Sequence, residues 1–143
     1  MIGNINVSLK AKQVIMQIYW HICFPADAFK TPHKGDECMV YSIEQFRVLN
    51  KPETIFMTQH SRKRFAERNI KLCDVCEVIN SGTIIEEYPD DFPYPSCLIL
   101  GKSNGRSLHV CASLNDGMIY VITSYVPDIS KWKSDLKTRK EEA

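Results

Sequence analysis

The sequence predicts a small α+β domain in which two N-terminal helices pack on an antiparallel sheet of about four strands. Apolar residues recur at helical spacing as far as Gly82, and the chain beyond it is rich in β-branched and aromatic residues. Two dipeptides, Asn104-Gly105 and Asp116-Gly117, are typical of tight hairpin turns. Helices followed by hairpin-linked strands indicate an α+β arrangement.

The helical part begins after a short predicted strand over residues 54–57. Thr58 is a suitable N-cap for a first helix over about residues 59–69, because its hydroxyl can accept from a free backbone N–H. A second helix is predicted over about residues 73–80, and Gly82 fits the position just after its end. The core-facing positions of the two helices are Phe65, Leu72, Val75, Val78 and Ile79.

Four strands are predicted over residues 83–88, 96–101, 106–113 and 118–126. The unbroken apolar run over residues 97–100 favours a central position for the second of them. Pro127 ends the last strand, because proline has no N–H to donate to a neighbour. Residues 130–140 are expected to form a short helix that carries Trp132.

Length and charge indicate one soluble domain with local basic clusters. The chain has 143 residues, 24% charged residues and a net charge of +1. Residues 1–53 form a poorly defined extension, and residues 54–140 hold the recognisable domain. Cations concentrate over residues 62–71 and 131–140, which could attract nucleic-acid phosphate or could simply be solvated surface.

The six cysteines do not suggest a disulfide framework, so we expect a cytoplasmic protein. Cys73 and Cys76 have C-x-x-C spacing, which is a weak zinc or redox signal without further ligands and more often reflects helix packing. We therefore predict neither a metal nor a cofactor. Cys97 and Cys111 lie in apolar runs and are expected in the core. The apolar stretch over residues 14–24 is too short to cross a bilayer.

Five residues are candidates for chemistry. His60, Arg64 and Arg68 share one face of the first helix, since they are spaced by four residues. His109 lies on the strand face opposite its apolar neighbours, and Tyr125 lies near the end of the last strand. Two histidines in one small domain could form an acid–base pair. A helix-start histidine with solvated arginines, and a partly buried strand histidine, are the structural alternatives.

Several segments of the chain form one longer pattern. They are His60-Ser-x-x-Arg64-x-x-Glu67-Arg68, Val78-Ile79-x-x-Gly82, Ile85-Glu86-x-Tyr88-Pro89, Pro93-Tyr94-Pro95, Leu98-x-Leu100-Gly101, Leu108-His109-Val110, Ile122-Thr123-x-Tyr125-x-Pro127-Asp128 and Trp132. Each segment is weakly diagnostic, but their order and spacing over about residues 54–140 are fairly specific. Together they resemble an uncharacterised family of small bacterial proteins grouped with RelE/ParE-like toxins.

The resemblance implies a RelE-like fold and a toxin of a type II toxin–antitoxin pair, acting as a metal-independent endoribonuclease on mRNA that can be ribosome-bound. It also implies a cognate antitoxin as partner, often a YgiT-type zinc-finger protein. The superfamily also contains gyrase poisons, so a non-catalytic binding protein or a gyrase-inhibiting toxin is the alternative. In the ribonuclease interpretation, His60 and His109 are the candidate acid and base. Arg64 and Arg68 would stabilise phosphate charge, and Tyr125 would orient a base or phosphate.

Overall fold

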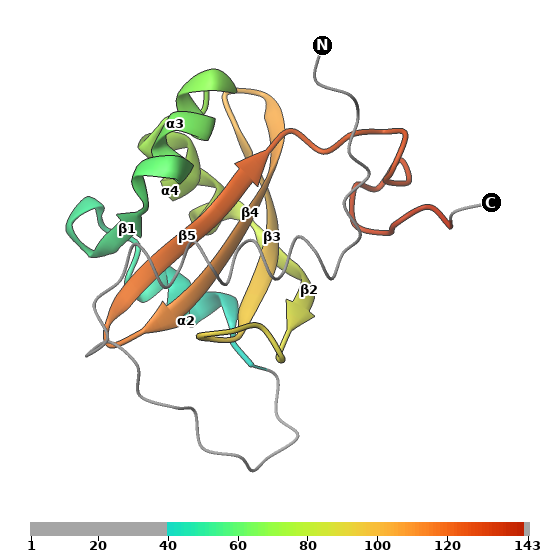
Figure 1. Cartoon of the computed structure of the whole chain (residues 1–143). Helices are drawn as coiled ribbons and strands as arrows, with labels where there is room; N and C mark the ends of the chain where they lie inside the picture. The colour runs from blue at the N-terminus through green and yellow to red at the C-terminus, as the bar shows by residue number, and fades with distance from the viewer. Residues whose placement is uncertain (1–39, 142–143) are drawn as a thin grey trace.

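The computed structural model describes residues 40–141, which form one sheet with helices on one side and a C-terminal tail on the other (Figure 1). The helical elements are α2 (Ile43–Val48), the 3-10 helix η2 (Pro52–Thr54), α3 (Gln59–Glu67) and α4 (Leu72–Ser81). The strands are β1 (Ile55–Met57), β2 (Thr83–Tyr88), β3 (Ser96–Ser103), β4 (Arg106–Asn115) and β5 (Met118–Tyr125).

The sheet is mixed and has five strands in the order β1-β5-β4-β3-β2. Strands β2 to β5 are antiparallel, as the sequence predicts, but β1 pairs with β5 in parallel. The expectation of about four antiparallel strands is corrected in this respect. A three-residue strand has too few positions to show which neighbour it joins, and a parallel neighbour requires a long connection rather than a turn.

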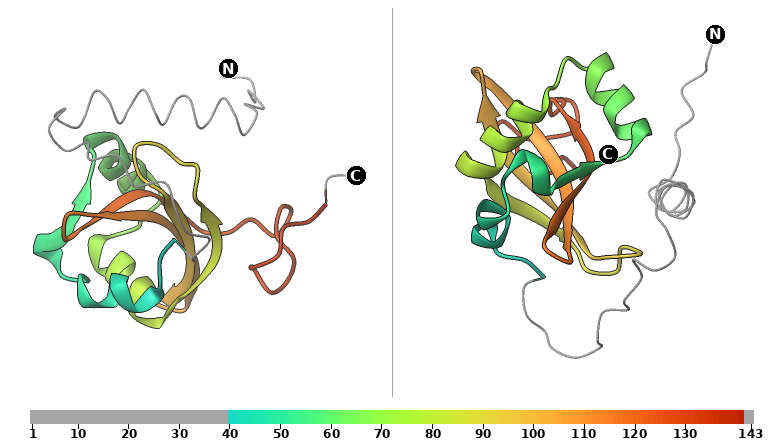
Figure 2. Two further views of the ribbon diagram at one scale, coloured as in Figure 1. Left: turned by 90° about the horizontal axis from the view of Figure 1, so that it is seen from below. Right: turned by 90° about the vertical axis from the view of Figure 1, so that its left-hand side faces the viewer.

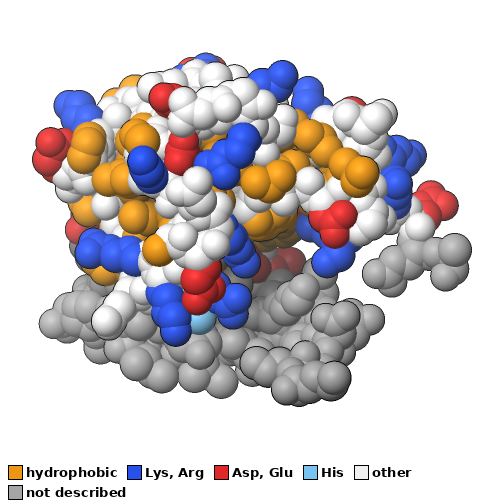
Figure 3. All heavy atoms as spheres, turned by 90° about the horizontal axis from the view of Figure 1, so that it is seen from above, with side chains coloured by type: hydrophobic (Ala, Val, Ile, Leu, Met, Phe, Trp, Pro, Cys, Tyr) orange, Lys and Arg blue, Asp and Glu red, His pale blue; other side chains and the backbone are white. Residues whose placement is uncertain are grey.

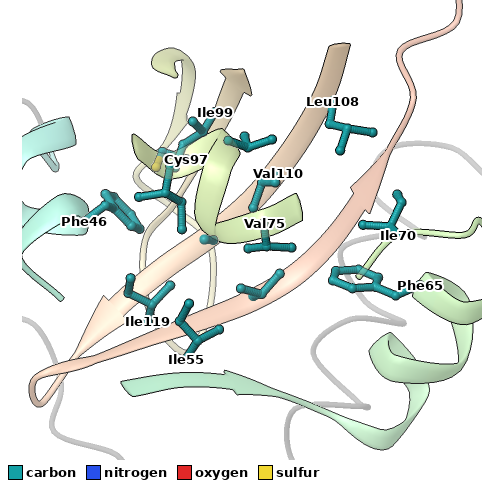
Figure 4. Packing of buried hydrophobic residues seen from close by; sticks show 14 residues of the cluster. Phe46, Ile55, Phe65, Ile70, Val75, Cys97, Ile99, Leu108, Val110 and Ile119 are labelled. Atoms are coloured by element: carbon teal, nitrogen blue, oxygen red, sulfur yellow. The ribbon is translucent and has the colours of Figure 1, made fainter. Parts of the chain in front are cut away.

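The main core lies between the sheet and the helices. Phe46 of α2, Phe65 of α3 and Val75 of α4 meet aliphatic side chains such as Ile99 and Val110 from the central strands (Figure 4). These five side chains are at most 3% exposed. Helix α2 falls within the stretch that the sequence left undefined, yet Phe46 is fully buried in this core.

Helix α4 packs closely on β3 because two glycines leave room for it. A Cβ on Gly101 would lie 2.5 Å from the carbonyl oxygen of Val78, and one on Gly82 would lie 2.3 Å from the same oxygen. Gly82 was predicted from its place after a helix, where a left-handed conformation is common. Its φ is −89°, so close approach rather than handedness requires glycine there.

The C-terminal tail, defined as residues 127–140, does not form the predicted helix. Its middle is a compact turn in which Trp132 and Arg139 make an isolated antiparallel bridge. Asp135 accepts hydrogen bonds from the backbone N–H groups of Lys137 and Thr138. Such local bonds favour turns over helices. The tail leaves the end of β5 and lies on the side of the sheet away from α4 (Figures 1 and 2).

Candidate functional site under the C-terminal tail

The sheet face opposite the helices, called here the tail face, carries both apolar and ionisable side chains. Its buried apolar residues are Leu98, Cys111 and Trp132, and Ile85, Tyr88, Ile122 and Leu136 pack against them. The strand alternation predicted for β4 is confirmed. Leu108, Val110 and Ala112 lie in the helix-side core, so their neighbours His109 and Cys111 point to the tail face.

His109 is fully buried at the centre of this face. Its Nε2 lies 2.8 Å from the carbonyl oxygen of Leu136, and its Nδ1 lies 3.3 Å from the hydroxyl of Tyr125. A carbonyl can only accept, so Nε2 carries the proton. Burial lowers the pKa of His109, which favours a neutral ring whose Nδ1 accepts from the Tyr125 O–H. The Trp132 ring covers His109 edge-on at 4.5 Å between centroids.

Glu86 on β2 is the carboxylate of the tail face. Arg139 donates from Nε to Oε1 at 2.8 Å and from Nη2 to Oε2 at 3.0 Å, and the Tyr88 hydroxyl also donates to Oε2. Burial alone would raise the pKa of Glu86, but the bonds from Arg139 and Tyr88 outweigh it and hold the pKa below its usual value. The Arg139 guanidinium also lies 4.6 Å from the centre of the Trp132 ring.

Helix α3 is joined to the end of β5 near this site. Thr58 caps the helix as predicted, accepting from the Ser61 N–H at 3.0 Å. The Ser61 hydroxyl donates to the Ile122 carbonyl at 3.0 Å. Arg68 donates from Nη1 to the Ser124 carbonyl at 2.7 Å. Ser61 in the first turn and Arg68 at the C-cap thus fix both ends of α3 beside the strand that bears Tyr125.

The structure therefore brings three of the five predicted site residues into one neighbourhood and separates two. His109 and Tyr125 are hydrogen-bonded, and Arg68 is bound to the strand that carries Tyr125. His60 and Arg64 lie on the exposed surface of α3. Among residues 40–141, neither makes a hydrogen bond or ion pair with His109 or Tyr125.

Two ionisable residues of this neighbourhood were not among the predicted site residues. Glu86 and Arg139 are 53 positions apart, and no local pattern links them. The spacing of Glu86 and Tyr88 was the available signal, because alternate residues of a strand share one face. Burial raises the pKa of Tyr125 to about 12, so its hydroxyl keeps its proton near neutral pH.

The cysteines of the described residues do not form a metal site with other ligands. Cys73 is exposed and Cys76 half-buried on α4, and residues 40–141 contain no group of three or more His, Cys, Asp or Glu side chains placed to hold a metal ion. Cys97 and Cys111 are buried, as predicted, and burial raises the pKa of Cys111 to about 12. Cys23 and Cys38 lie outside the described residues.

Residues 57–126 match the model of a protein family described as a domain of unknown function (DUF4258). The match starts at the last residue of β1 and stops one residue after β5, so the tail lies outside it. No curated protein and no solved structure matches the chain significantly. Within the described residues, no helix is long and apolar enough to cross a membrane.

Proposed function

We propose that the chain is a cytoplasmic toxin of a type II toxin–antitoxin system that cleaves mRNA as a metal-independent endoribonuclease. The observation that carries the proposal is the His109–Tyr125 pair on the tail face, beside the arginines Arg68 and Arg139. A histidine held in one tautomer next to fixed positive charge is suited to moving protons at a phosphate. The resemblance to RelE/ParE-like toxins supports the same class.

The proposed reaction is an in-line attack of a ribose 2′-hydroxyl on the adjacent phosphorus. The O2′–P bond forms, the P–O5′ bond breaks, and the products are a 2′,3′-cyclic phosphate and a 5′-hydroxyl. In the proposal, displacement of the tail frees the His109 ring to carry its proton on Nδ1, which then donates to the Tyr125 hydroxyl oxygen. The unprotonated Nε2 takes the proton of the 2′-hydroxyl, and a water molecule protonates the 5′-oxygen. Arg68 stabilises the developing phosphate charge, and Tyr125 holds the imidazole in place.

Catalysis by His109 requires that the tail move. With the tail docked, the Nε2–H of His109 is bonded to Leu136 and the ring is fully buried. His60 was expected as the second proton-transfer group, but within residues 40–141 the hydrogen-bond partners of the His109 ring are Tyr125 and Leu136 instead. In the proposal, His60 and Arg64 instead contact phosphates along the RNA from the exposed side of α3.

The surface charge supports nucleic-acid contact without defining a single path. Exposed cations on α3 and on the tail include Arg62, Lys63, Lys131, Lys133 and Lys137. Figure 3 shows Lys and Arg side chains spread around one face, with acidic and apolar side chains between them. Such an arrangement supports diffuse attraction to phosphate rather than one basic groove. The proposed antitoxin, a YgiT-type zinc-finger protein, would cover part of this surface.

The second candidate is a non-catalytic toxin that binds a partner such as gyrase. The burial of His109, with both ring nitrogens already hydrogen-bonded, favours this alternative. A histidine in that state is a structural residue unless the tail is displaced. The two candidates differ in one observable, which is whether new RNA ends arise in cells.

The deciding experiment is 5′-end mapping of RNA after brief expression of the wild type and of two variants. His109→Gln keeps hydrogen-bonding groups at the buried position, and the second variant replaces His60, Arg64 and Arg68 by alanine. We expect new ends with the wild type and a loss of roughly 10²–10⁴ in cleavage rate with His109→Gln. A matched control replaces the exposed Lys51 and Lys102 by alanine and should still cleave.

Growth arrest without new ends would contradict the ribonuclease proposal and favour the binding candidate. An oligonucleotide with a 2′-deoxy sugar at the cut site gives a second check, because it lacks the nucleophile. Cleavage of that substrate would contradict the mechanism. Absence of both arrest and new ends would contradict the toxin proposal as a whole.

A further inference from the structure

Glu86 is a half-buried carboxylate whose cation comes from outside the matched family segment. Its side chain is 22% exposed, and among residues 40–141 Arg139 is the one cation within ion-pair distance of it. Arg139 lies in the tail, whereas the match ends at residue 126. A partly buried carboxylate without a partner is costly. The matched part of the fold therefore supplies this carboxylate with the Tyr88 hydroxyl but with no cation, which has to come from elsewhere.

The tail that supplies these donors is separable from the rest of the fold. The helix-side core contains no tail residue. The tail folds back on itself, with hydrogen bonds from Lys133 N to the Thr138 oxygen at 2.8 Å and from Lys140 N to the Lys131 oxygen at 2.9 Å. Leu136 adopts a left-handed conformation with φ of 57°, which is unfavourable for leucine. This strained conformation places the Leu136 carbonyl oxygen within hydrogen-bond distance of His109.

The tail residues that face the sheet have the shape and donors of a nucleotide base. Arg139 is planar and offers two parallel N–H groups to the two oxygens of Glu86. Guanine offers the same pair, N1–H and the exocyclic amine, on its Watson–Crick edge. Adenine, cytosine and uracil each offer one donor beside an acceptor there. The flat Trp132 ring contacts both residues: the Arg139 guanidinium lies over it at 4.6 Å, and the His109 ring meets it edge to face at 4.5 Å.

We propose that Glu86 binds the Watson–Crick edge of a guanine base, and that the tail occupies this site with Arg139 in the state described here. The inference rests on the proposed function in that it takes RNA as the ligand. Tyr88 positions the carboxylate through its bond to Oε2. The irregular pairing of β2 with β3 between Ile84 and Glu86 helps to aim the side chain, since bulges redirect side chains at sites.

The test measures nucleotide binding to the full chain by titration calorimetry, with the 3′-monophosphates of guanosine, inosine and adenosine as probes. Arg139→Ala removes the competing donors. We expect this variant to bind the guanosine nucleotide about tenfold more tightly than the adenosine nucleotide. Inosine lacks the exocyclic amine and should fall between them. The wild type should bind all three more weakly than Arg139→Ala binds the guanosine nucleotide.

Adding Glu86→Gln to Arg139→Ala should abolish the preference for guanosine, because an amide cannot accept two N–H groups side by side. Two controls match the changes in charge. Lys51→Ala removes an exposed cation outside α3 and the tail and should behave like the wild type. Glu53→Gln, added to Arg139→Ala, should keep the preference. Equal affinity of Arg139→Ala for the three nucleotides, or a preference that survives Glu86→Gln, would overturn the inference.

Circular dichroism and thermal melting establish first that each variant folds. If Arg139→Ala does not fold, Arg139→Lys takes its place, because lysine keeps the charge but lacks the planar pair of donors. Failures of the two proposals are distinguishable. Guanosine preference without RNA cleavage would overturn the proposed function alone. Mapped cut sites without guanine nearby, together with equal nucleotide affinities, would overturn this inference alone.

Discussion

The two faces of the sheet are covered in opposite ways. The helix side is a core of aliphatic and aromatic side chains from three helices and all five strands. The tail side has a smaller apolar cluster. Beside this cluster, His109 is hydrogen-bonded to Leu136 of the tail, and Glu86 is hydrogen-bonded to Arg139 of the tail. Helices satisfy most of their own backbone hydrogen bonds and bring apolar side chains to the helix side. The tail is held by side chains and a few backbone bonds.

This difference indicates which side of the sheet can take part in function. Burial of apolar area is the main stabilising term, and the helix side supplies most of it. The tail side adds polar contacts that are costly when left unpaired but exchangeable for those of a ligand. Local opening draws on regions with few buried apolar contacts and an exposed backbone. The tail meets this description, and α4 does not.

The largest expected effect comes from adjacent residues of β3 that face opposite sides. Ile99 is 0% and Leu98 is 2% exposed. We expect Ile99→Ala to lower the free energy of unfolding by about 4 kcal/mol, and Leu98→Ala by about 2 kcal/mol, since the tail can settle into the cavity more easily than a helix can. Urea denaturation measures both. Equal losses, or the reverse order, would break the comparison.

Trp132→Ala tests whether the tail is separable. We expect a loss of about 1–2 kcal/mol, below the roughly 3–5 kcal/mol typical of a truncated core tryptophan, because the tail can detach while the core stays folded. Amide hydrogen exchange tests whether the tail detaches while the core stays folded. The amides of Lys133 and Lys140 should lose protection, while those of α4 keep it. Loss of protection throughout α4 would show that the tail is part of the core.

Acidification should weaken the tail side through His109. The pKa of His109 is lowered in the folded protein, so below about pH 6.5 the unfolded chain binds a proton that the folded chain does not. Stability is therefore intact above the unfolded pKa and falls as the pH drops towards the folded pKa, by at most about 1.4 kcal/mol per pH unit. Glu86 and Arg139 also face this ring, with opposite effects on it.

Thermal melts between pH 7.5 and 5.5 measure the effect. The lowered pKa of Glu86 has its influence below this window, so Glu86 does not contribute to the slope within it. His109→Gln should flatten the pH dependence. An unchanged slope in that variant would assign the pH dependence to another group.

The smallest expected effect is the coupling between Glu86 and Arg139. The Arg139 side chain is 49% exposed, so solvent screens the pair. A double-mutant cycle with Glu86→Gln and Arg139→Ala should give a coupling of about 0.5–1 kcal/mol that shrinks in high salt. A coupling several times larger would mean that the tail is held too firmly to act as an exchangeable occupant.

The locally encoded parts of the fold were predictable. Both hairpin turns form where the sequence places them, with φ of 50° at Asn104 and Asp116 and φ of 74° and 73° at the glycines that follow. Helices α3 and α4 begin and end within about two residues of the prediction. Each of these depends on a cap, a turn dipeptide or a periodic apolar pattern, all of which span a few residues.

The candidate site was predictable only in part. Strand alternation gave the face of its own strand on which His109 lies, but it did not show that His109 pairs with Tyr125. Grouping His60 with His109 relied only on the presence of two histidines in one small domain, which says nothing about where α3 lies relative to the sheet. Glu86 belonged to one of the family-like segments but was not predicted as a site residue, because its partner Arg139 lies far away in the sequence.

By itself, the sequence determined the α+β class, the two hairpins, the helix capped by Thr58 and the alternation around His109. Only the tertiary structure decided the parallel pairing of β1, the close packing that requires Gly82 and Gly101, and the position of the tail over His109 and Glu86. The physical reason is the distance along the chain over which each interaction acts. Propensity, capping and turn conformation act between neighbours along the chain, whereas the partner of a buried charge is chosen by packing among segments that meet only after folding.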